Sequence, residues 1–560
     1  MSMELDRAAE ALRCAEQVVE LATGAMAEIG VDNAQVVAYD LAHAAAAVAT
    51  ARAALVYGRR GEVEARLACA FVADVLADLR AKIAGRSATW RAVEDLLDPA
   101  DDFAAAHRDP ETLAALCGVE GPRHLPDELE LARQTFHRFA KHEIRPHAEH
   151  VHRTNADIPE SIVSGLADLG AFGLSVPEEH GGFASGGESD YMGMVVATEE
   201  LSWGSLGIGG SLITRPEILT RALVRGGTEE QKRRWLPKIS SGELLAAVAV
   251  TEPDHGSDVA RITTSASPTA GGWVVNGVKT WCTFAARADV LMLLARTDPD
   301  RTKGHRGLSL FVVDKEQATG KGFVLRQSSG GGGLGAGGLG GGGLGGGGLG
   351  GGGLGGGGGK LEGRPIDTLG YRGMHSYELA FENWFVPAEN LVGGEEGLGK
   401  GFYLQMQGFE NGRLQTVARA VGVMQAAYEA AIAYARERNV FGRAIIDYQL
   451  TRAKLARMAV LIQASRQFSY EVARLMAKGE GALEASMAKA YVCRAAEWVT
   501  REAMQIHGGM GYAEEYPVSR YFVDARVLSI FEGADETLAL KVIARRLVER
   551  HDSPRPGGPA

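Results

Sequence analysis

The clearest catalytic candidate is Glu532, a single carboxylate that follows the mostly apolar run 528–531 and directly precedes Gly533. Burial raises the pKa of a carboxylic acid, which suits a general base. The neighbouring glycine lets the backbone approach a ligand closely. The same pattern is typical of a helix or strand end that meets a turn, so Glu532 alone does not define a site.

Four other runs carry groups that could hold a polar or aromatic ligand. They are Thr251-Glu252-Pro253 with Gly256-Ser257-Asp258, Gly277-Val278-Lys279-Thr280-Trp281-Cys282-Thr283, Glu437-Arg438-Asn439-Val440-Phe441-Gly442-Arg443, and Gln505-Ile506-His507-Gly508-Gly509-Met510-Gly511-Tyr512. Hydroxyl groups donate hydrogen bonds, and arginine adds a fixed charge with a fork of donors. Taken singly, Trp281 is typical of a β core, Arg438 of a solvated helix end, and Gly508 of a helix stop.

The elements that position these runs alternate in type. Apolar residues recur every three or four positions over 158–169, and Gly170 then offers a helix stop. Short β-type runs follow, and Asn276-Gly277 predicts a hairpin turn. A long amphipathic helix is predicted around 414–432, with further helices over 450–478 and 482–507.

Residues 1–110 precede this core and are rich in helix-forming residues. Their pattern predicts helices over 5–28, 33–57 and 62–84, and Pro99 marks a break before another helix. We interpret this region as a small helical bundle with a structural or assembly role.

Residues 330–359 are almost wholly glycine, with a leucine at every fifth position from Leu334 to Leu354. Glycine loses the most backbone entropy on ordering, and one leucine in five residues buries little surface, so we predict a flexible inserted loop. A phosphate-binding loop is disfavoured because the strand–turn–helix setting is missing.

Composition excludes several classes of protein. The 560 residues carry a net charge of −11, which argues against nucleic acid as a partner. The five cysteines are scattered, which disfavours a zinc site or a disulfide framework and fits a reducing compartment. The acidic start lacks the features of a signal peptide, and no apolar run of membrane-spanning length occurs. We therefore expect a cytoplasmic protein without a membrane partner and without a metal.

In their order and spacing, the four runs and the closing Phe531-Glu532-Gly533 resemble the acyl-CoA dehydrogenase family of flavoproteins over about 125–550. The resemblance implies an α+β multidomain fold. It consists of a helical domain (125–242), a middle β domain (243–390, with the loop 330–359), a C-terminal four-helix domain (395–550) and a tail (551–560). The helical region 1–110 would be an extra N-terminal extension.

The resemblance also implies FAD between the β domain and the C-terminal helices. Trp281 would cover one face of the flavin, and Thr283 would donate a hydrogen bond near its N5 atom. The other cofactor contacts expected from the β domain are Val248, Val250, Thr251, Gly256 and Ser257. Those expected from the C-terminal domain are Arg438, Phe441, Gln449, Gln505, Gly508 and Gly509. In the family, Arg438 and the 505–509 loop meet the FAD of a neighbouring subunit, so a homodimer or homotetramer is expected.

Glu532 would then remove the α-proton of an acyl-CoA thioester while the β-hydrogen leaves as hydride, and an electron-transferring flavoprotein would accept the electrons. Backbone N–H groups near Glu532 would stabilise the enolate-like charge. One departure is Ala534, which stands where many family members carry a threonine that contacts FAD. That contact is therefore not expected here.

The extension, the glycine-rich insertion and the run 366–378 are similar to those of members that act on a branched dicarboxylic acyl-CoA. A buried substrate carboxylate needs a cation or several N–H donors. We expect Arg413, Arg215, Ser257 and Gly533 on the substrate side, with Arg215 as the partner of the carboxylate. The alternative for Arg215 is a surface arginine at a helix start.

Three other functions stay open at this point. The chain could dehydrogenate another short branched or dicarboxylic acyl-CoA. It could pass electrons to oxygen as an oxidase. It could also be a non-catalytic flavin-binding member of the family, although the acidic balance and the presence of Glu532 count against that interpretation.

Overall fold

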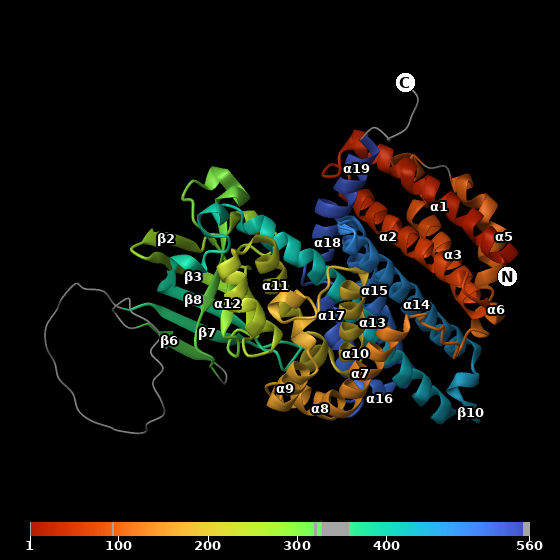
Figure 1. The fold of residues 1–560 in the computed structure, drawn as a ribbon. Coiled ribbons are helices and arrows are strands. Elements are labelled where there is room, and N and C mark those ends of the chain that lie inside the picture. Colours follow the sequence, from red (N-terminus) through yellow and green to blue (C-terminus); the bar gives the residue numbers. More distant parts are fainter. Residues whose placement is uncertain (1, 92–93, 319–321, 328–357, 553–560) are drawn as a thin grey trace.

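The computed structural model describes residues 2–91, 94–318, 322–327 and 358–552 (Figure 1). The predicted flexible loop over 330–359 lies almost entirely outside the described residues, as does most of the tail. The β domain lies at one end of the molecule, the N-terminal helices lie at the other, and the C-terminal helices lie between them (Figure 1).

The three helices predicted at the N-terminus are confirmed as α1 (Ser2–Ile29), α2 (Gln35–Gly58) and α3 (Glu62–Ile83). Shorter helices follow as α4 (Ser87–Trp90), η1 (Glu94–Ala100), α5 (Asp101–Arg108) and α6 (Pro110–Ala114). The bundle shares its apolar core with α14 (Gln449–Ala477) and α19 (Ala544–Asp552), through Ala456, Val460 and Ala544. The extension therefore packs directly on the C-terminal domain.

Helix α2 is the most apolar element of the bundle. Within the described parts of the chain, it alone has the length and hydropathy of a candidate membrane span, but 78% of that window is buried in the protein. A core helix of a folded protein passes the same test, so the apolar character of α2 is accounted for by its packing.

A linker over 115–126 joins the extension to the next domain. Arg123 pairs with Glu199 at 3.1 Å and with Glu200 at 2.6 Å. The hydroxyl of Tyr57 on α2 donates to the carbonyl of Pro122 at 3.0 Å. The linker is thus held to α2 and to the helical domain.

The helical domain follows the predicted pattern, and Gly170 takes a φ of +70° just after its third main helix. Its elements are α7 (Asp127–Phe139), η2 (Ala140–Ile144), α8 (Arg145–Thr154), α9 (Glu160–Asp168), η3 (Ala171–Gly173), η4 (Glu178–His180), α10 (Glu188–Gly204), η5 (Leu206–Gly210), α11 (Thr214–Gly226) and α12 (Glu229–Ser240).

The middle domain is an eight-stranded sheet with the order β1-β4-β2-β3-β8-β7-β6, and β5 pairs with β4. The strands are β1 (Ala246–Ala249), β2 (Ser265–Thr269), β3 (Gly272–Thr283), β4 (Val290–Arg296), β5 (Leu308–Asp314), β6 (Phe323–Arg326), β7 (Lys360–Ile366) and β8 (Ser376–Pro387). The short helices η6 (Val259–Arg261), η7 (Arg301–Gly307), η8 (Ala388–Asn390) and η9 (Gly394–Gly397) connect or follow them.

The prediction of a hairpin turn at Asn276-Gly277 is wrong. Both residues lie inside β3, and the turn between β2 and β3 falls at 270–271. The Asn276 side chain instead bonds Asn383 across the sheet, accepting from its N–H at 2.8 Å and donating to its side-chain oxygen at 3.3 Å. Asn383 has a φ of +49° at a register shift between β3 and β8, so the sequence signal marks a β-bulge.

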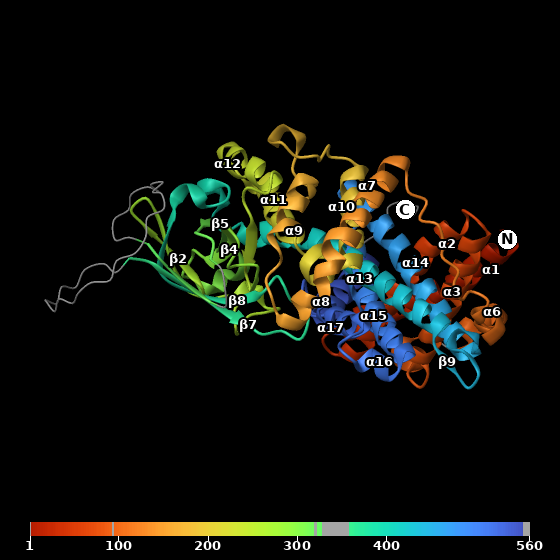
Figure 2. The same cartoon turned by 90° about the horizontal axis from the view of Figure 1, so that it is seen from below.

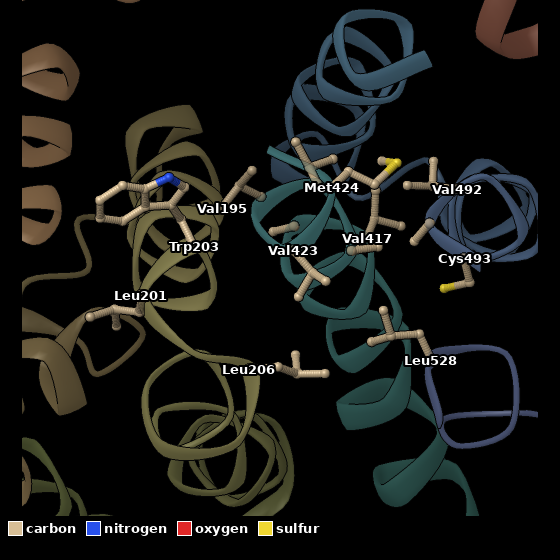
Figure 3. Packing of buried hydrophobic residues seen from close by; sticks show 14 of the residues in the cluster. Val195, Leu201, Trp203, Leu206, Val417, Val423, Met424, Val492, Cys493 and Leu528 are labelled. Carbon is tan, nitrogen blue, oxygen red and sulfur yellow. The ribbon is translucent and has the colours of Figure 1, made fainter. Parts of the chain in front are cut away.

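The C-terminal domain is built around α13 (Gly401–Glu437), which begins against β5 and extends into the helical bundle (Figure 2). Val195 of α10 faces Val423 of α13, while Val492 of α15 (Ala482–His507) packs on the other side of α13 (Figure 3). The remaining elements are β9 (Asn439–Val440), β10 (Arg443–Ala444), η10 (Ile445–Asp447), α16 (Gly509–Tyr512), α17 (Pro517–Leu528), α18 (Asp535–Thr537) and η11 (Leu538–Ile543). The predicted long helix and its two successors are therefore confirmed.

Candidate active site

Glu532 lies in the short loop between α17 and α18. Its φ is +54° and that of Gly533 is +103°, so two consecutive residues occupy the left-handed half of backbone space. For a residue other than glycine this conformation is strained, and such strain concentrates at functional sites. The Glu532 side chain is only 7% exposed, and its Oε2 atom has no hydrogen-bond partner among the described residues.

The carboxylate of Glu532 lies against α13. A Cβ atom placed on Gly412 would be 3.0 Å from Glu532 Oε2, so a larger residue there would push the carboxylate away. Gly412 directly precedes Arg413, a residue predicted for the substrate side. Helix α13 therefore leaves space for the Glu532 carboxylate at Gly412 and provides a cation, Arg413, at the next position.

Arg215 is buried next to Glu532, which corrects the alternative that it is a surface arginine. It is the second residue of α11, but its Nη1 atom lies 3.8 Å from Glu532 Oε1. Its Nη2 atom donates to the hydroxyl of Tyr371 at 3.4 Å. The Tyr371 ring in turn meets Phe531 edge-on, with centroids 5.6 Å apart.

Helix α13 adds two further buried guanidinium groups to the environment of Glu532. Arg413 donates to Ser486 at 3.2 Å, and burial lowers its pKa. Arg419 is fully buried, lies over the Phe531 ring at 4.6 Å, and also has a pKa lowered by burial. No described carboxylate lies within ion-pair distance of Arg413 or Arg419.

The flavin-type runs of the β domain are held together by a buried ion pair. Lys279 Nζ lies 3.0 Å from Glu252 Oε1 and donates to the carbonyl of Val250 at 2.9 Å. The N–H of Thr280 donates to the carbonyl of Thr251 at 2.8 Å. Burial lowers the pKa of Lys279 to about 8 despite the nearby carboxylate. The first two runs are therefore one structural unit.

Trp281 and Thr283 end β3 in different environments. Trp281 is 56% exposed and has a φ of +58°, so the prediction from the residue alone of a core tryptophan is wrong. Thr283 is buried, and its hydroxyl shares a hydrogen bond with that of Ser376 at 3.0 Å. An exposed indole plane next to a buried hydroxyl suits the face and edge of an aromatic ring system.

Ser257 connects the β domain to the loop that carries the base. Its hydroxyl accepts a hydrogen bond from Thr537 at 3.0 Å, five residues after Glu532. Gly256 is exposed beside it, while Val248 is half-buried and Val250 is buried next to β1. The structure thus brings Ser257 of the first β-domain run and the loop of the predicted base to one junction between domains.

The residues at this junction fit a flavin. Ser257 and Thr283 offer hydroxyl groups, Trp281 offers an exposed ring, and Glu532 offers a buried oxygen without a partner. FAD, when bound, supplies the hydride acceptor, while the protein supplies orientation and electrostatics.

The C-terminal residues predicted for the cofactor form a separate group. Arg438 ends α13, Phe441 is 98% exposed in the β9–β10 turn, and Gln505, Gly508 and Gly509 are exposed at the end of α15. The rings of Tyr434 and His507 stack at 4.3 Å and join these two helix ends. Arg438 is roughly 37 Å along the helix from Arg413, at 1.5 Å per residue. One chain therefore does not bring this group to Glu532, as expected if it serves a neighbouring subunit.

Gln449 differs from the other predicted cofactor residues. Its side-chain amide donates to the carboxylate of Glu111 on α6, so in this structure it contacts the extension. The cofactor role assigned to Gln449 stays a prediction.

The fold and the junction define a flavin-dependent dehydrogenase, and comparison with known sequences identifies its family. The acyl-CoA dehydrogenase N-terminal, middle and C-terminal domains match residues 126–243, 247–339 and 399–548. The chain belongs to the acyl-CoA dehydrogenase family and is an FAD-dependent oxidoreductase of acyl-CoA.

Individual relatives are similar over most of the chain. The (2S)-methylsuccinyl-CoA dehydrogenase of Cereibacter sphaeroides is 40% identical, with 88% of this chain and 85% of that protein covered. A mitochondrial 2-methylacyl-CoA dehydrogenase of Solanum tuberosum is 34% identical, with 76% and 91% covered. Among solved structures, the glutaryl-CoA dehydrogenase complex with glutaryl-CoA is 29% identical with a TM-score of 0.65, and covers 76% of this chain and 96% of its own.

Several residues of the site escaped prediction from the sequence. One is Gly412, which lies against Glu532. Another is Tyr371, which accepts from Arg215 and meets the Phe531 ring. The third is Arg419, which lies over the Phe531 ring. Arg419 carried a usable signal, because it is a cation between Val417 and Val421 on a helix of otherwise apolar periodicity. Tyr371 carried none, since it lies in a loop between β7 and β8.

Proposed function

We propose that this protein oxidises (2S)-methylsuccinyl-CoA to mesaconyl-CoA, a reaction of the ethylmalonyl-CoA pathway. This substrate is a branched thioester with a free carboxylate. The similarity to the dehydrogenase of Cereibacter sphaeroides supports the proposal, and the charge balance around Glu532 supports it independently.

The observation that carries the proposal is an excess of buried positive charge. Arg215 and Arg419 are both buried near Glu532, and only Arg215 has that carboxylate within ion-pair distance. A buried charge without a counter-ion is costly, and a hydrogen-bonded anion relieves that cost. A substrate carboxylate bound between Arg215 and Arg419 would supply the missing negative charge, whereas a neutral acyl chain would not.

Glu532 is proposed to take the α-proton, so that one carboxylate oxygen gains the proton as the Cα–H bond breaks. The electron pair of that bond forms the α,β double bond while the β-hydrogen leaves as hydride. Thioester oxygen accepts hydrogen bonds as negative charge develops on it, and a backbone N–H near Glu532 is a suitable donor. Burial of Arg413 and Arg215 keeps water from competing for the charged groups.

A spectral titration tests this function. Purified FAD-loaded protein is mixed under anaerobic conditions with (2S)-methylsuccinyl-CoA, glutaryl-CoA or isobutyryl-CoA, and the flavin absorbance band is followed. We expect bleaching by methylsuccinyl-CoA at far lower concentration than by isobutyryl-CoA, which has a branch but no carboxylate. Equal bleaching by isobutyryl-CoA would contradict the proposed substrate, and a greater effect of glutaryl-CoA would favour another dicarboxylic thioester.

The remaining assignments are also proposals. Electron-transferring flavoprotein is proposed as the electron acceptor, and a solved structure named for the electron transferring flavoprotein of Acidaminococcus fermentans is similar to this chain. The separate group at Arg438 supports a homodimer or homotetramer, and a cytoplasmic location is proposed from the sequence alone. Reduction of the acceptor flavoprotein without peroxide release would support a dehydrogenase over an oxidase. A protein that binds FAD but oxidises none of the three thioesters would favour the non-catalytic alternative.

A further inference from the structure

The loop that carries Glu532 needs external support. Glu532 and Gly533 both have positive φ, and such a conformation persists only when its surroundings fix it. Within the C-terminal domain, the N–H of Asp535 closes the loop on the carbonyl of Ser529 at 3.1 Å. Lys489 donates to the carbonyl of Gly533 at 2.6 Å.

The N-terminal extension adds two further contacts at the end of this loop. Asp535 ends the loop, and its buried Oδ2 atom accepts a hydrogen bond from the Tyr39 hydroxyl at 2.5 Å. The His43 Nε2 atom lies 3.2 Å from the same oxygen. Both residues are on α2, one turn apart, and they lie more than 490 positions from Asp535 in the sequence.

The two contacts also determine the ionisation of Asp535. Burial by itself would raise its pKa, but the hydrogen bond and charge of His43 and the hydrogen bond of Tyr39 outweigh it, so the pKa lies below its usual value. The neighbouring cations Lys489 and Arg494 face the same region, and Arg494 lies over the Tyr39 ring at 5.9 Å. An ionised Asp535 therefore accepts from α2 at the point where the catalytic loop ends.

We propose that the extension is part of the catalytic apparatus, because Tyr39 and His43 of α2 position the Glu532 loop through Asp535. The inference rests on the proposed role of Glu532 as base. Tyr39 and His43 are positioning residues. Only Gly533 and Ala534 separate Glu532 from Asp535, so a shift of Asp535 is transmitted directly to the carboxylate.

The chain offers a matched control in Tyr57. Tyr57 is on the same helix, is buried, and also donates a hydrogen bond, but its partner is Pro122 in the linker. Tyr39→Phe removes the hydroxyl bond to Asp535, whereas Tyr57→Phe removes the bond to Pro122 and the one that its hydroxyl accepts from Gln463 at 2.9 Å. Only the first removes a contact with the loop that carries Glu532.

The test compares these variants as full-length, FAD-loaded proteins. For Tyr39→Phe we expect flavin reduction by methylsuccinyl-CoA to slow roughly tenfold with little change in KM, since small misplacement of a reacting group lowers kcat. The isotope effect of α-deuterated substrate should grow. Amide hydrogen exchange should accelerate over 529–535, and Tyr57→Phe should change none of these readings.

Substitution of His43 gives a second, graded test. His43→Gln keeps a donor for Asp535 and is expected to retain most of the rate, whereas His43→Leu is expected to lose as much as Tyr39→Phe. Wild-type rates and loop exchange in both Tyr39→Phe and His43→Leu would overturn the inference. Equal rate losses in Tyr39→Phe and Tyr57→Phe, each in proportion to the variant's loss of thermal stability, would also overturn the inference. They would show that α2 stabilises the whole fold and does not position the Glu532 loop in particular.

The failure of this inference can be separated from failure of the proposed function. If Glu532→Gln retains turnover, the base assignment itself is wrong. If Glu532→Gln is inactive while Tyr39→Phe is normal, only the positioning role is wrong. Hydrogen exchange over 529–535 reports on the α2 contact in either case, because it does not require turnover.

Discussion

The guanidinium of Arg215 lies 3.8 Å from the carboxylate of Glu532, so the cation proposed to receive the substrate's carboxylate is already paired with the proposed base. The two interactions compete for one guanidinium. A substrate that brings its own carboxylate draws Arg215 away and leaves Glu532 free to take a proton. A neutral acyl chain would leave the ion pair intact, so under the proposed function we expect the arrangement to favour dicarboxylic thioesters in two ways.

Replacement of Arg215 tests this selection. Arg215→Gln should raise the apparent KM for methylsuccinyl-CoA about tenfold or more, because hydrogen bonds to charged groups contribute about 1.5–3 kcal/mol. The same variant should not lose rate with isobutyryl-CoA. Arg225→Gln, at an exposed position on the same helix, is the control. An unchanged KM for methylsuccinyl-CoA would contradict the assigned role of Arg215.

Replacement of Arg419 separates stability from function. This fully buried cation has no carboxylate partner in the described chain, so Arg419→Met should leave the free energy of unfolding unchanged or raise it by about 1–4 kcal/mol. Binding of methylsuccinyl-CoA should weaken at the same time. Arg466→Met is the contrast, since Arg466 pairs with Glu199 at 2.8 Å. Its loss should lower the free energy of unfolding, by less than the roughly 3–5 kcal/mol of a fully broken buried pair because Arg123 still pairs with Glu199 at 3.1 Å. Urea unfolding and substrate titration of both variants measure the two effects.

Removal of the proposed base should abolish turnover without loss of the cofactor. Glu532→Gln is expected to reduce kcat by roughly 10²–10⁴, the range for a general base. Its FAD content should match that of the wild type. Glu536→Gln, which alters an exposed carboxylate four residues away, should be unaffected. A normal kcat in Glu532→Gln would exclude the proton-transfer role.

The buried Glu252–Lys279 pair predicts a specific acid sensitivity. Burial would raise the pKa of Glu252, but the charge of Lys279 and hydrogen bonds from Thr264 and Thr263 lower it to about 2, from 4.5. Because the folded pKa is below the unfolded one, this stabilisation is present above pH 4.5 and is lost as the pH falls toward 2.

The comparison with Glu252→Gln isolates this contribution. The wild type should be more stable than the variant at pH 7, because the variant leaves the buried charge of Lys279 without its partner. The difference should shrink as the pH falls below 4.5. Urea unfolding between neutral pH and pH 3 measures it, and parallel stability curves for the two proteins would refute the assignment.

The exposed indole of Trp281 gives an optical test of the cofactor site. Addition of FAD to protein stripped of flavin should quench tryptophan fluorescence, because the cofactor would cover a ring that is 56% exposed. Trp281→Phe should lose much of the quenching that Trp273→Phe retains, since Trp273 lies at the other end of β3. Equal quenching in the two variants would place the flavin elsewhere.

Sequence patterns predicted the elements whose signal is local. The helices around α1, α2, α3 and α13 follow from apolar periodicity and helix-forming composition. Asn276 shows the limit of such signals. Its side chain forms a hydrogen bond with Asn383 on β8. A local sequence pattern cannot predict a partner more than a hundred positions away.

The residues of the candidate site also fall into two groups, those that local sequence patterns indicate and those that only tertiary packing brings together. Glu532 and the flavin-type runs were recognisable from residue type and order. Arg215 was expected on the substrate side, but only its contact with Glu532 excludes the alternative of an exposed helix start. Tyr39 and His43 were not recognisable at all, since nothing in α2 indicates a partner at Asp535. Contacts that join distant segments are a property of tertiary packing.

The packing of α1 on α19 has a consequence for biosynthesis. Asp32, just after α1, pairs with Lys541 and Arg545, the latter 513 positions later, and α14 contributes to the core of the bundle. The ribosome completes the N-terminal bundle long before these partners emerge. The apolar face of the bundle therefore stays exposed to solvent during most of translation. A nascent chain stopped before residue 529 would have both an unfinished bundle and no catalytic loop, so the enzyme becomes competent only when its late helices arrive.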